Sequence, residues 1–455
     1  MRHCKMKLLA LILCVSLSGC ASRTADRPAP AIANNDEIFN SFSIAEYGYD
    51  EPLTAHESIS AGEKEEEIPP LPVYKLKKEE RTIAVQVLLI DCNNLEELDD
   101  RLKTLRESGV NTLIFRVFHN KGDRFYSFAD PKNDRGVYFK SKHAPLVDDI
   151  LADVARISHK NGIKIFAWMT TRYADYGVEH KREWQAAAYD LKGGGYVRAR
   201  GLNLFNRDVK NHLINLYRDL AAYNVDGILF QDDLVLRHSE GFSRDARLAF
   251  ARESGLMPDP NLLYREVIES RSGKMMVTAY GDLFWEWSRW KNRRLMRLAS
   301  EIMTESKKVN SNIKFALNLM YEAALKPKEA LAWLSQDLNE AVKTGFDYYA
   351  IMAYHLQMGE ELGLEGSNLY SVVAQLVENA LKKVNDPEKI MIKLQIADWK
   401  SKKRVSHDEI NKIVKIVREK GNTSLAFVPY YGKFDFRKIM PAINSPSTLA
   451  LQAKF

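Results

Sequence analysis

The chain has 455 residues, 45% of them hydrophobic and 28% charged, and its 66 Lys and Arg against 60 Asp and Glu leave a formal net charge of +6. This ordinary globular composition excludes a disordered or collagen-like chain and leaves enough apolar residues for a large core. The small basic excess does not indicate nucleic-acid binding, and four cysteines are too few for a disulfide scaffold or a Cys-rich zinc module.

The N-terminus has the pattern of an export signal. Positively charged residues precede an apolar run over 8–17, and Leu17-Ser18-Gly19-Cys20 follows. This tetrapeptide resembles the bacterial lipobox, which implies a signal peptide over 1–19, cleavage before Cys20 and a lipid on its thiol. Because Ala21 and Ser22 follow rather than Asp, we expect a lipid-anchored protein of the outer membrane that faces the periplasm. An ordinary signal peptide or an N-terminal membrane anchor remains the alternative.

Residues 20–80 have the composition of a tether. Prolines interrupt the segment, like charges gather at 65–67, and no apolar period is visible. Such a segment indicates a flexible linker that holds the following domain away from the membrane. The alternative is a peptide that wraps around that domain.

The remainder alternates short apolar runs with amphipathic stretches. The expected strands are 83–90, 112–118, 164–169, 227–230, 314–320, 348–354, 390–396 and 424–428. The expected helices are 95–108, 146–159, 209–223, 284–309, 333–344, 371–384 and 408–419. This alternation predicts a (β/α)8 TIM barrel over 81–440 with a short tail over 441–455, and an open doubly wound sheet is the alternative. Glycines 109, 162, 345 and 421 stand at helix-to-strand corners, where a left-handed residue is useful.

The chemistry of such a barrel lies at the C-terminal ends of its strands. Carboxylates, amides, arginines and aromatic rings gather there, which suits sugars because sugars present apolar ring faces and many hydroxyls. The predicted substrate-binding residues are Asp91, Arg116, Trp168, Arg172, Asn318, Tyr321, Glu322, Tyr354, Gln395, Asp398, Trp399 and Tyr430. The competing interpretation is structural: the rings cap the barrel core, and Asp91 and Asp398 cap neighbouring helices.

Two adjacent carboxylates, Asp232 and Asp233, end the apolar run 226–231. Alternation along a strand points their side chains in different directions, so one of them can face a scissile bond while the other orients the substrate. Mutual repulsion raises one pKa and favours a carboxyl group that holds its proton, as acetal cleavage requires. We therefore predict Asp232 and Asp233 as catalytic residues, against the alternative that they begin an exposed loop or cap a helix.

Four segments carry a resemblance to a known family. Residues 226–233 resemble a Gly-Ile-Leu-Phe-His-Asp-Asp motif, 315–319 an Ala-Arg-Asn-Leu strand, and 394–399 a Leu-Gln-Thr-Val-Asp-Trp strand, with 348–353 between them. In this order they resemble glycoside hydrolase family 153, the C-terminal domain of PgaB-type proteins of biofilm export. The resemblance implies a (β/α)8 barrel that hydrolyses, within the chain, partly de-N-acetylated poly-β-1,6-N-acetylglucosamine. An export porin and a separate deacetylase are the protein partners that it implies.

The chain departs from the family motif at three places, which leaves the polymer open. Gln231 replaces a His, Leu317 replaces an Arg, and Tyr354-His355-Leu356 replaces Met-Pro-Tyr. The metal-dependent deacetylase domain that accompanies the family domain is not expected here, because no His-x-x-x-His pair occurs among the ten histidines. The spacing of the histidines also predicts no metal site, and no cofactor is expected.

Two classes of function follow from the sequence. The first is an endo-acting glycoside hydrolase of an amino-sugar exopolysaccharide. The second is a non-catalytic lipoprotein that holds the polymer during export, with the barrel as a binding groove. A hydrolase of a different glycan is a third possibility.

Overall fold

The computed structural model describes residues 81–178, 180–270 and 273–445. Eight parallel strands form a closed barrel in the order β1-β14-β13-β12-β11-β8-β5-β2, which confirms the TIM barrel and excludes the open sheet. The strands are β1 (Ile83–Val87), β2 (Thr112–Arg116), β5 (Lys164–Met169), β8 (Gly227–Phe230), β11 (Lys314–Met320), β12 (Tyr348–Ala353), β13 (Ile390–Gln395) and β14 (Ser424–Val428). The signal peptide and tether expected over 1–80 lie outside the described residues.

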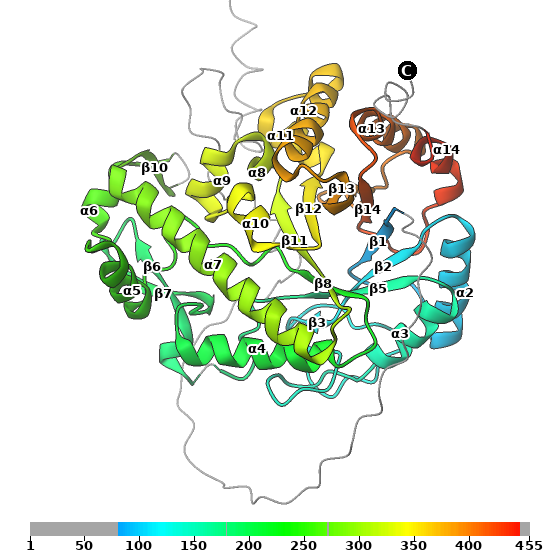
Figure 1. Ribbon diagram of the computed structural model, residues 1–455, viewed down its shortest axis with the longest axis horizontal. Coiled ribbons are helices and arrows are strands. Elements are labelled where there is room, and N and C mark those ends of the chain that lie inside the picture. The colour runs from blue at the N-terminus through cyan, green and yellow to red at the C-terminus, as the bar shows by residue number, and fades with distance from the viewer. Residues whose placement is uncertain (1–80, 179, 271–272, 446–455) are drawn as a thin grey trace, which may run out of the picture.

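Helices surround the barrel, as Figure 1 shows. The connecting helices are α2 (Leu95–Glu107), α3 (Leu151–Lys160), α4 (Arg207–Ala221), α7 (Asp282–Val309), α8 (Glu322–Leu325), α9 (Pro327–Leu334), α10 (Leu338–Thr344), α11 (His355–Leu362), α12 (Gly366–Val384), α13 (His407–Lys420) and α14 (Met440–Ile443). Local sequence explains their starts: the Asn94 side chain accepts a hydrogen bond from the Glu97 amide at the beginning of α2, and Asn206 caps α4 in the same way.

Several bounds differ from the expectations: the strands expected over 83–90 and 112–118 end at Val87 and Arg116, and the helix expected over 371–384 begins at Gly366. The helix expected over 146–159 begins only at Leu151. The helix expected over 333–344 is split into α9 and α10, because Ser335 adopts a left-handed φ of 50°. Gly421 is extended rather than left-handed, with φ 175°. A Cβ there would lie 2.9 Å from Leu381 Cδ1, so this glycine provides room for packing.

Two insertions build a lobe beside the barrel. The hairpin β6 (Gln185–Asp190) and β7 (Gly195–Leu202) follows β5. The helices α5 (Arg244–Ser254) and α6 (Pro260–Leu263) and the hairpin β9 (Tyr264–Glu269) and β10 (Met275–Tyr280) follow β8. A second hydrophobic cluster joins this lobe to α7, with Trp287 and Trp290 buried and their rings stacked at 5.0 Å. These two tryptophans therefore pack rather than bind, as their helical spacing indicates.

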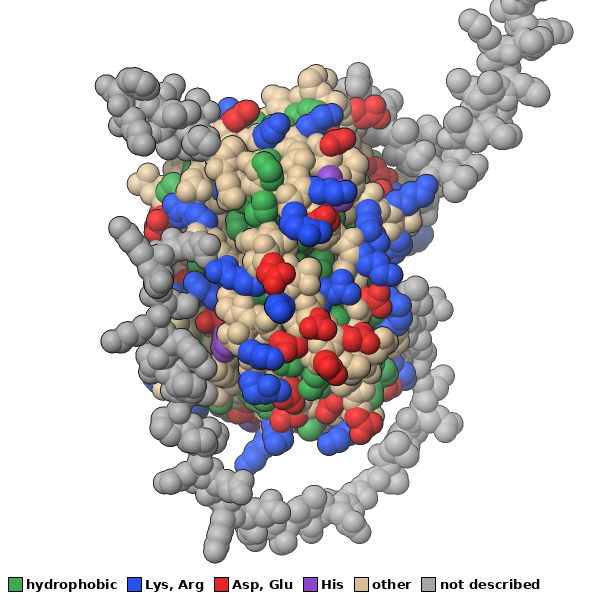
Figure 2. Space-filling view, turned by 90° about the vertical axis from the view of Figure 1, so that its right-hand side faces the viewer, with side chains coloured by type: hydrophobic (Ala, Val, Ile, Leu, Met, Phe, Trp, Pro, Cys, Tyr) green, Lys and Arg blue, Asp and Glu red, His purple; other side chains and the backbone are tan. Residues whose placement is uncertain are grey.

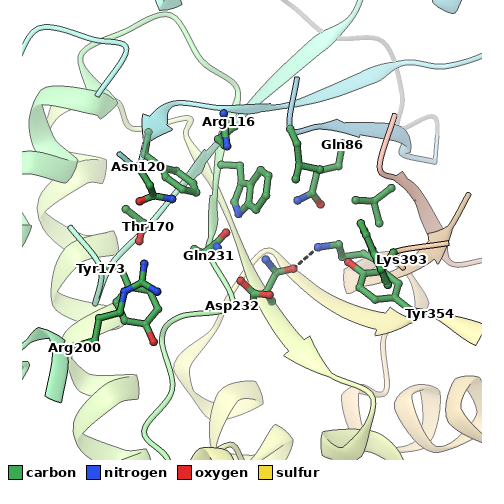
Figure 3. Close-up of a pocket in the computed structure, with 16 residues that line it drawn as sticks. Gln86, Arg116, Asn120, Thr170, Tyr173, Arg200, Gln231, Asp232, Tyr354 and Lys393 are labelled. Carbon is green, nitrogen blue, oxygen red and sulfur yellow. Dashed lines mark hydrogen bonds between the residues drawn. The ribbon is translucent and has the colours of Figure 1, made fainter. Parts of the chain in front are cut away.

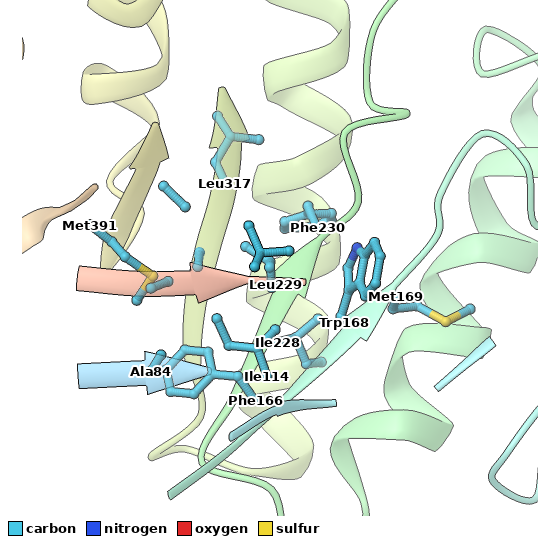
Figure 4. Close-up of a cluster of buried hydrophobic side chains, with 14 of the residues drawn as sticks. Ala84, Ile114, Phe166, Trp168, Met169, Ile228, Leu229, Phe230, Leu317 and Met391 are labelled. Carbon is cyan, nitrogen blue, oxygen red and sulfur yellow. The ribbon is translucent and has the colours of Figure 1, made fainter. Parts of the chain in front are cut away.

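Buried apolar side chains fill the barrel and the layer between strands and helices, with Ala84, Ile114, Phe166, Ile228 and Met391 among them (Figure 4). The outer surface is different: Figure 2 shows one side of the molecule covered by interspersed Lys, Arg, Asp and Glu side chains, with hydrophobic groups in small areas. Among the described helices, none combines the length and the apolar character needed to cross a bilayer.

Candidate active site

A cavity opens at the C-terminal end of the barrel strands. All eight barrel strands, or the loops directly after them, contribute to its lining (Figure 3). The lining residues are Gln86, Leu88, Arg116, Phe118, Asn120, Trp168, Thr170, Tyr173, Arg200, Gln231, Asp232, Asn318, Tyr354, Lys393, Trp399 and Val428. The cavity therefore lies where TIM-barrel enzymes have their active sites.

Asp232 is the carboxylate among these lining residues. Its Oδ1 is buried and has no hydrogen-bond partner among the described residues. Burial raises the pKa of Asp232 to about 6, while the positive charge of Lys393 opposes this rise and the charge of Asp233 adds to it. A carboxyl group with such a pKa holds its proton in weakly acidic solution and can donate it to a leaving oxygen.

Asp233 has a different environment, and its side chain is fully buried outside the cavity lining. It accepts hydrogen bonds from Thr170 Oγ1 at 2.6 Å, from the Thr171 amide at 3.0 Å and from the Tyr173 amide at 2.8 Å. Burial raises the pKa of Asp233, and these hydrogen bonds oppose the rise. The two neighbours therefore point in different directions: Asp232 lines the cavity, and Asp233 holds the loop after β5, to which Thr170 and Tyr173 belong.

Lys393 on β13 is a site residue that the sequence analysis missed. Its side chain is buried, and its Nζ donates a hydrogen bond to Asn318 Oδ1 at 2.8 Å, drawn as the dashed line in Figure 3. Asn318 in turn donates from Nδ2 to the carbonyl of Phe230 at 3.0 Å, directly before the loop that carries Asp232. Burial lowers the pKa of Lys393 to about 8, and the charge of Asp232 opposes this fall.

Aromatic rings line the cavity, as the sequence predicted for a sugar site. Tyr354 and Trp399 lie edge to face with ring centroids 5.5 Å apart, and Phe118 packs against Trp168 at 5.5 Å in the same manner. Figure 3 shows Tyr173 and Arg200 on one side of the cavity and Tyr354 and Lys393 on the opposite side, with Asp232 between them. Rings around a polar centre provide stacking faces for a bound sugar.

The structure brings six of the fourteen predicted catalytic and substrate-binding residues into this lining: Arg116, Trp168, Asp232, Asn318, Tyr354 and Trp399. Asp91 and Tyr430, together with Arg116, line a second hollow beside the cavity. Asp91 is exposed and lies 3.4 Å from Lys433 Nζ, and it does not cap α2, because Asn94 does.

The other predicted residues make structural contacts outside both hollows. Arg172 is buried and forms an ion pair with Glu240. Gln395 donates to the Ala397 carbonyl at 2.9 Å, and Asp398 accepts from the Lys400 and Ser401 amides at 2.7 Å each.

Tyr321 and Glu322 are buried outside the lining of both hollows. Tyr321 donates to Glu361 Oε2 at 2.7 Å. Burial, with a smaller contribution from the Glu361 charge, raises the pKa of Glu322 to about 8. Within the described residues no group of three His, Cys, Asp or Glu side chains is arranged to hold a metal ion.

Sequence reasoning also missed Gln86 and Arg200. Gln86 is a polar residue inside the apolar run of β1, and it is buried. Its position in that run was a signal visible in the sequence, because a buried polar group needs a partner or a function. Arg200 comes from the β6–β7 hairpin, and no local pattern shows that this insertion reaches the cavity.

A closed parallel barrel whose C-terminal cavity combines a proton-holding carboxyl group with aromatic rings is the arrangement of a glycoside hydrolase. The comparisons agree with this class. The chain belongs to the hypothetical glycosyl hydrolase family 13, whose family model matches residues 93–431. No curated protein matches the sequence.

Solved structures share the fold. The PgaB (BpsB) glycoside hydrolase domain from Bordetella bronchiseptica is similar with a TM-score of 0.59 and 23% identity, over 78% of this chain and 95% of that domain. A β-galactosidase from the psychrophilic Marinomonas ef1 has a TM-score of 0.51 and 10% identity, over 82% of this chain and 59% of that one. A β-galactosidase from Rahnella sp. R3 has a TM-score of 0.51 and 12% identity, over 80% and 55%. The chain thus has the barrel of glycan hydrolases, with PgaB among its structural neighbours.

Proposed function

We propose that the protein is an endo-acting glycoside hydrolase in which Asp232 is the general acid. The observation that carries the proposal is the position of Asp232: its carboxyl group lines the central cavity, and burial raises its pKa to about 6. General acid catalysis by a positioned carboxyl group contributes roughly 10²- to 10⁴-fold to a rate. Protonation of the leaving oxygen is the step that acetal cleavage needs most from the protein.

The second half of the reaction needs a nucleophile or base. Asp233 is committed to three hydrogen bonds with the loop after β5, and neither Glu322 nor Asp398 lines the cavity. An N-acetyl sugar can supply its own nucleophile, because the acetamide oxygen attacks the anomeric carbon as the leaving group departs. Substrate-assisted hydrolysis with retained configuration is therefore the mechanism that fits this lining best, and Asp233 acts as a positioning residue.

Lys393 and Asn318 set the charge at the reacting centre. The charge of Lys393 keeps the pKa of Asp232 from rising further, so that the acid can both hold and release its proton near pH 6. The hydrogen bond of 2.8 Å between Lys393 Nζ and Asn318 Oδ1 fixes the ammonium in the barrel interior. The pair thus supports the acid and does not donate the proton itself.

The cavity continues into the second hollow through the shared residues Leu88 and Arg116. An extended chain can lie across both hollows, which supports cleavage within a polymer. The polymer that the family resemblance suggests is partly de-N-acetylated poly-β-1,6-N-acetylglucosamine. A lipid on Cys20 would hold the enzyme at the outer membrane on the periplasmic side, beside an export porin and a separate deacetylase.

One observation favours the second candidate, a polymer-binding lipoprotein without activity: Asp232 has no second carboxylate beside it in the cavity lining. Two measurements on the same polymer separate the candidates. Wild type, Asp232→Asn and the exposed control Asp100→Asn are incubated with partly de-N-acetylated and fully acetylated polymer. Products are analysed by mass spectrometry, and binding is measured by sedimentation with the polymer.

We expect oligosaccharides from wild type and from Asp100→Asn, and a loss of at least about 100-fold for Asp232→Asn with binding retained. Wild type that binds both polymers and releases no oligosaccharide would establish the binding function instead. Neither binding nor release on either polymer would direct the search to a different glycan.

A further inference from the structure

The hollow beside the cavity is built from the loops that follow β1, β2, β13 and β14. It is open to solvent and meets the cavity at Leu88 and Arg116. A glycan that passes through the cavity has this hollow as its continuation.

Basic side chains dominate the hollow, which we call the basic trough. Five cationic residues line it, against two carboxylates, Asp91 and Asp123. The five are Arg116, Arg124, Lys402, Arg404 and Lys433. Both carboxylates are already engaged: Asp123 Oδ2 lies 2.9 Å from Arg116 Nη1, and Asp91 Oδ2 lies 3.4 Å from Lys433 Nζ. The excess charge of the trough is therefore positive.

Arg116 is held in a fixed position in this lining, unlike an exposed surface arginine. It is 5% exposed, and its Nε has no hydrogen-bond partner among the described residues although Nη1 is bound to Asp123. This Nε is itself buried, and the ion pair with Asp123 holds the guanidinium in place. Arg116 lies at the point where the cavity and the trough meet.

The lining of the central cavity also carries a net positive charge. Arg200 and Lys393 line it together with Arg116, and Asp232 is the carboxylate among its lining residues (Figure 3). Across both hollows the lining residues comprise seven cationic side chains and three carboxylates. Charge of one sign in adjoining concavities attracts ligands of the opposite sign.

We propose that the glycan cleaved here carries carboxylate groups on the sugars that occupy the basic trough, as uronic acids or acid-substituted hexosamines do. This inference rests on the proposed hydrolase activity, and it replaces the cationic polymer that the family resemblance suggests with an acidic glycan. A stretch of de-N-acetylated glucosamine carries ammonium groups and is repelled by the trough, whereas a carboxylate pairs with arginine in a bidentate manner. Sugars in the cavity itself remain free to be N-acetylated.

The test varies the charge of the nitrogen substituents along one polymer backbone. A single preparation of partly de-N-acetylated poly-β-1,6-N-acetylglucosamine is divided into three parts: unmodified and cationic, re-N-acetylated and neutral, and N-succinylated and anionic. Binding to each is measured with Asp232→Asn, and cleavage with wild type. We expect affinity to follow the order anionic, neutral, cationic, and the anionic advantage to shrink as salt is raised from 0.05 to 0.5 M, since screening shortens the reach of exposed charges.

The second part of the experiment uses substitutions in the basic trough. Arg124→Ala and Lys433→Ala, each introduced into Asp232→Asn, should weaken binding of the anionic polymer by roughly 2- to 5-fold and leave the neutral polymer unchanged. The exposed Lys415→Ala on α13 is the matched control and should change neither. Tightest binding of the cationic polymer, or equal weakening for all three polymers, would overturn the inference. If wild type binds the three polymers and cleaves none, the binding function replaces the proposed hydrolase, while the binding order still decides the charge preference.

Discussion

Replacing Asp232 by Asn should lower activity and raise stability at the same time. Asp232 is partly exposed with its Oδ1 buried, and a carboxyl group whose pKa is raised from 3.8 to about 6 binds its proton more tightly in the folded than in the unfolded chain. Each unit of pKa shift corresponds to 1.36 kcal/mol. Ionisation of Asp232 therefore costs the folded state about 3 kcal/mol above pH 6. Asn imitates the protonated carboxyl group and avoids this cost.

The size of this stabilisation depends on pH. Between pH 4 and 6 the folded state holds a proton that the unfolded state has lost, so the contribution of Asp232 to stability falls as the pH rises. Below pH 4 both states are protonated, and the variant should match wild type. At pH 7.5 it should be more stable by about 3 kcal/mol, with a cleavage rate lower by at least about 100-fold.

The assay is urea unfolding of wild type, Asp232→Asn and the exposed control Asp100→Asn at pH 4 and at pH 7.5. The free-energy difference at each pH is read from the transition midpoints and the common slope. A variant that is less stable at pH 7.5, or equally stabilised at both pH values, would refute the burial of Asp232 as an ionised group.

Four further predictions concern the site and the N-terminus. Asp233→Asn should destabilise the fold by about 1–3 kcal/mol by urea unfolding, because one carboxamide cannot accept all the hydrogen bonds from the loop after β5. In wild type, kcat/KM should fall with rising pH above about 6, and Lys393→Met should move this limb to higher pH, because the lysine charge holds the pKa of Asp232 down. Trp399→Ala should raise KM about 10-fold with kcat little changed, as measured by initial rates on polymer, through loss of a stacking face. Cys20→Ser should move the protein from the membrane pellet to the soluble fraction after cell lysis, because no lipid can be attached.

Much of the barrel could be predicted from the sequence, because each strand is a short apolar run followed by polar residues. The bounds expected for β5, β8, β11 and β14 match the structure residue for residue. The side-by-side position of the strand ends also follows from the fold class, so Asp232, Trp168 and Asn318 could be assigned to one mouth in advance.

The roles of individual site residues were harder to predict from the sequence than the barrel. Alternation implied that Asp232 and Asp233 point in different directions, but which one meets the cavity depends on the turn after β8. Lys393 was missed because a lysine inside an apolar strand is informative only once its inward face is known. Arg200 reaches the cavity from an inserted hairpin, and such a long-range contact leaves no local pattern.

The most direct test of Asp232 as the general acid compares two leaving groups. Wild type and Asp232→Asn are assayed on an oligosaccharide of N-acetylglucosamine with a 2,4-dinitrophenyl leaving group and on the same oligosaccharide with a sugar in that position. A dinitrophenolate leaves without a proton, so the variant should keep most of its rate on the aryl substrate and lose at least about 100-fold on the sugar substrate. Equal losses on both substrates would contradict the assignment of the proton to Asp232.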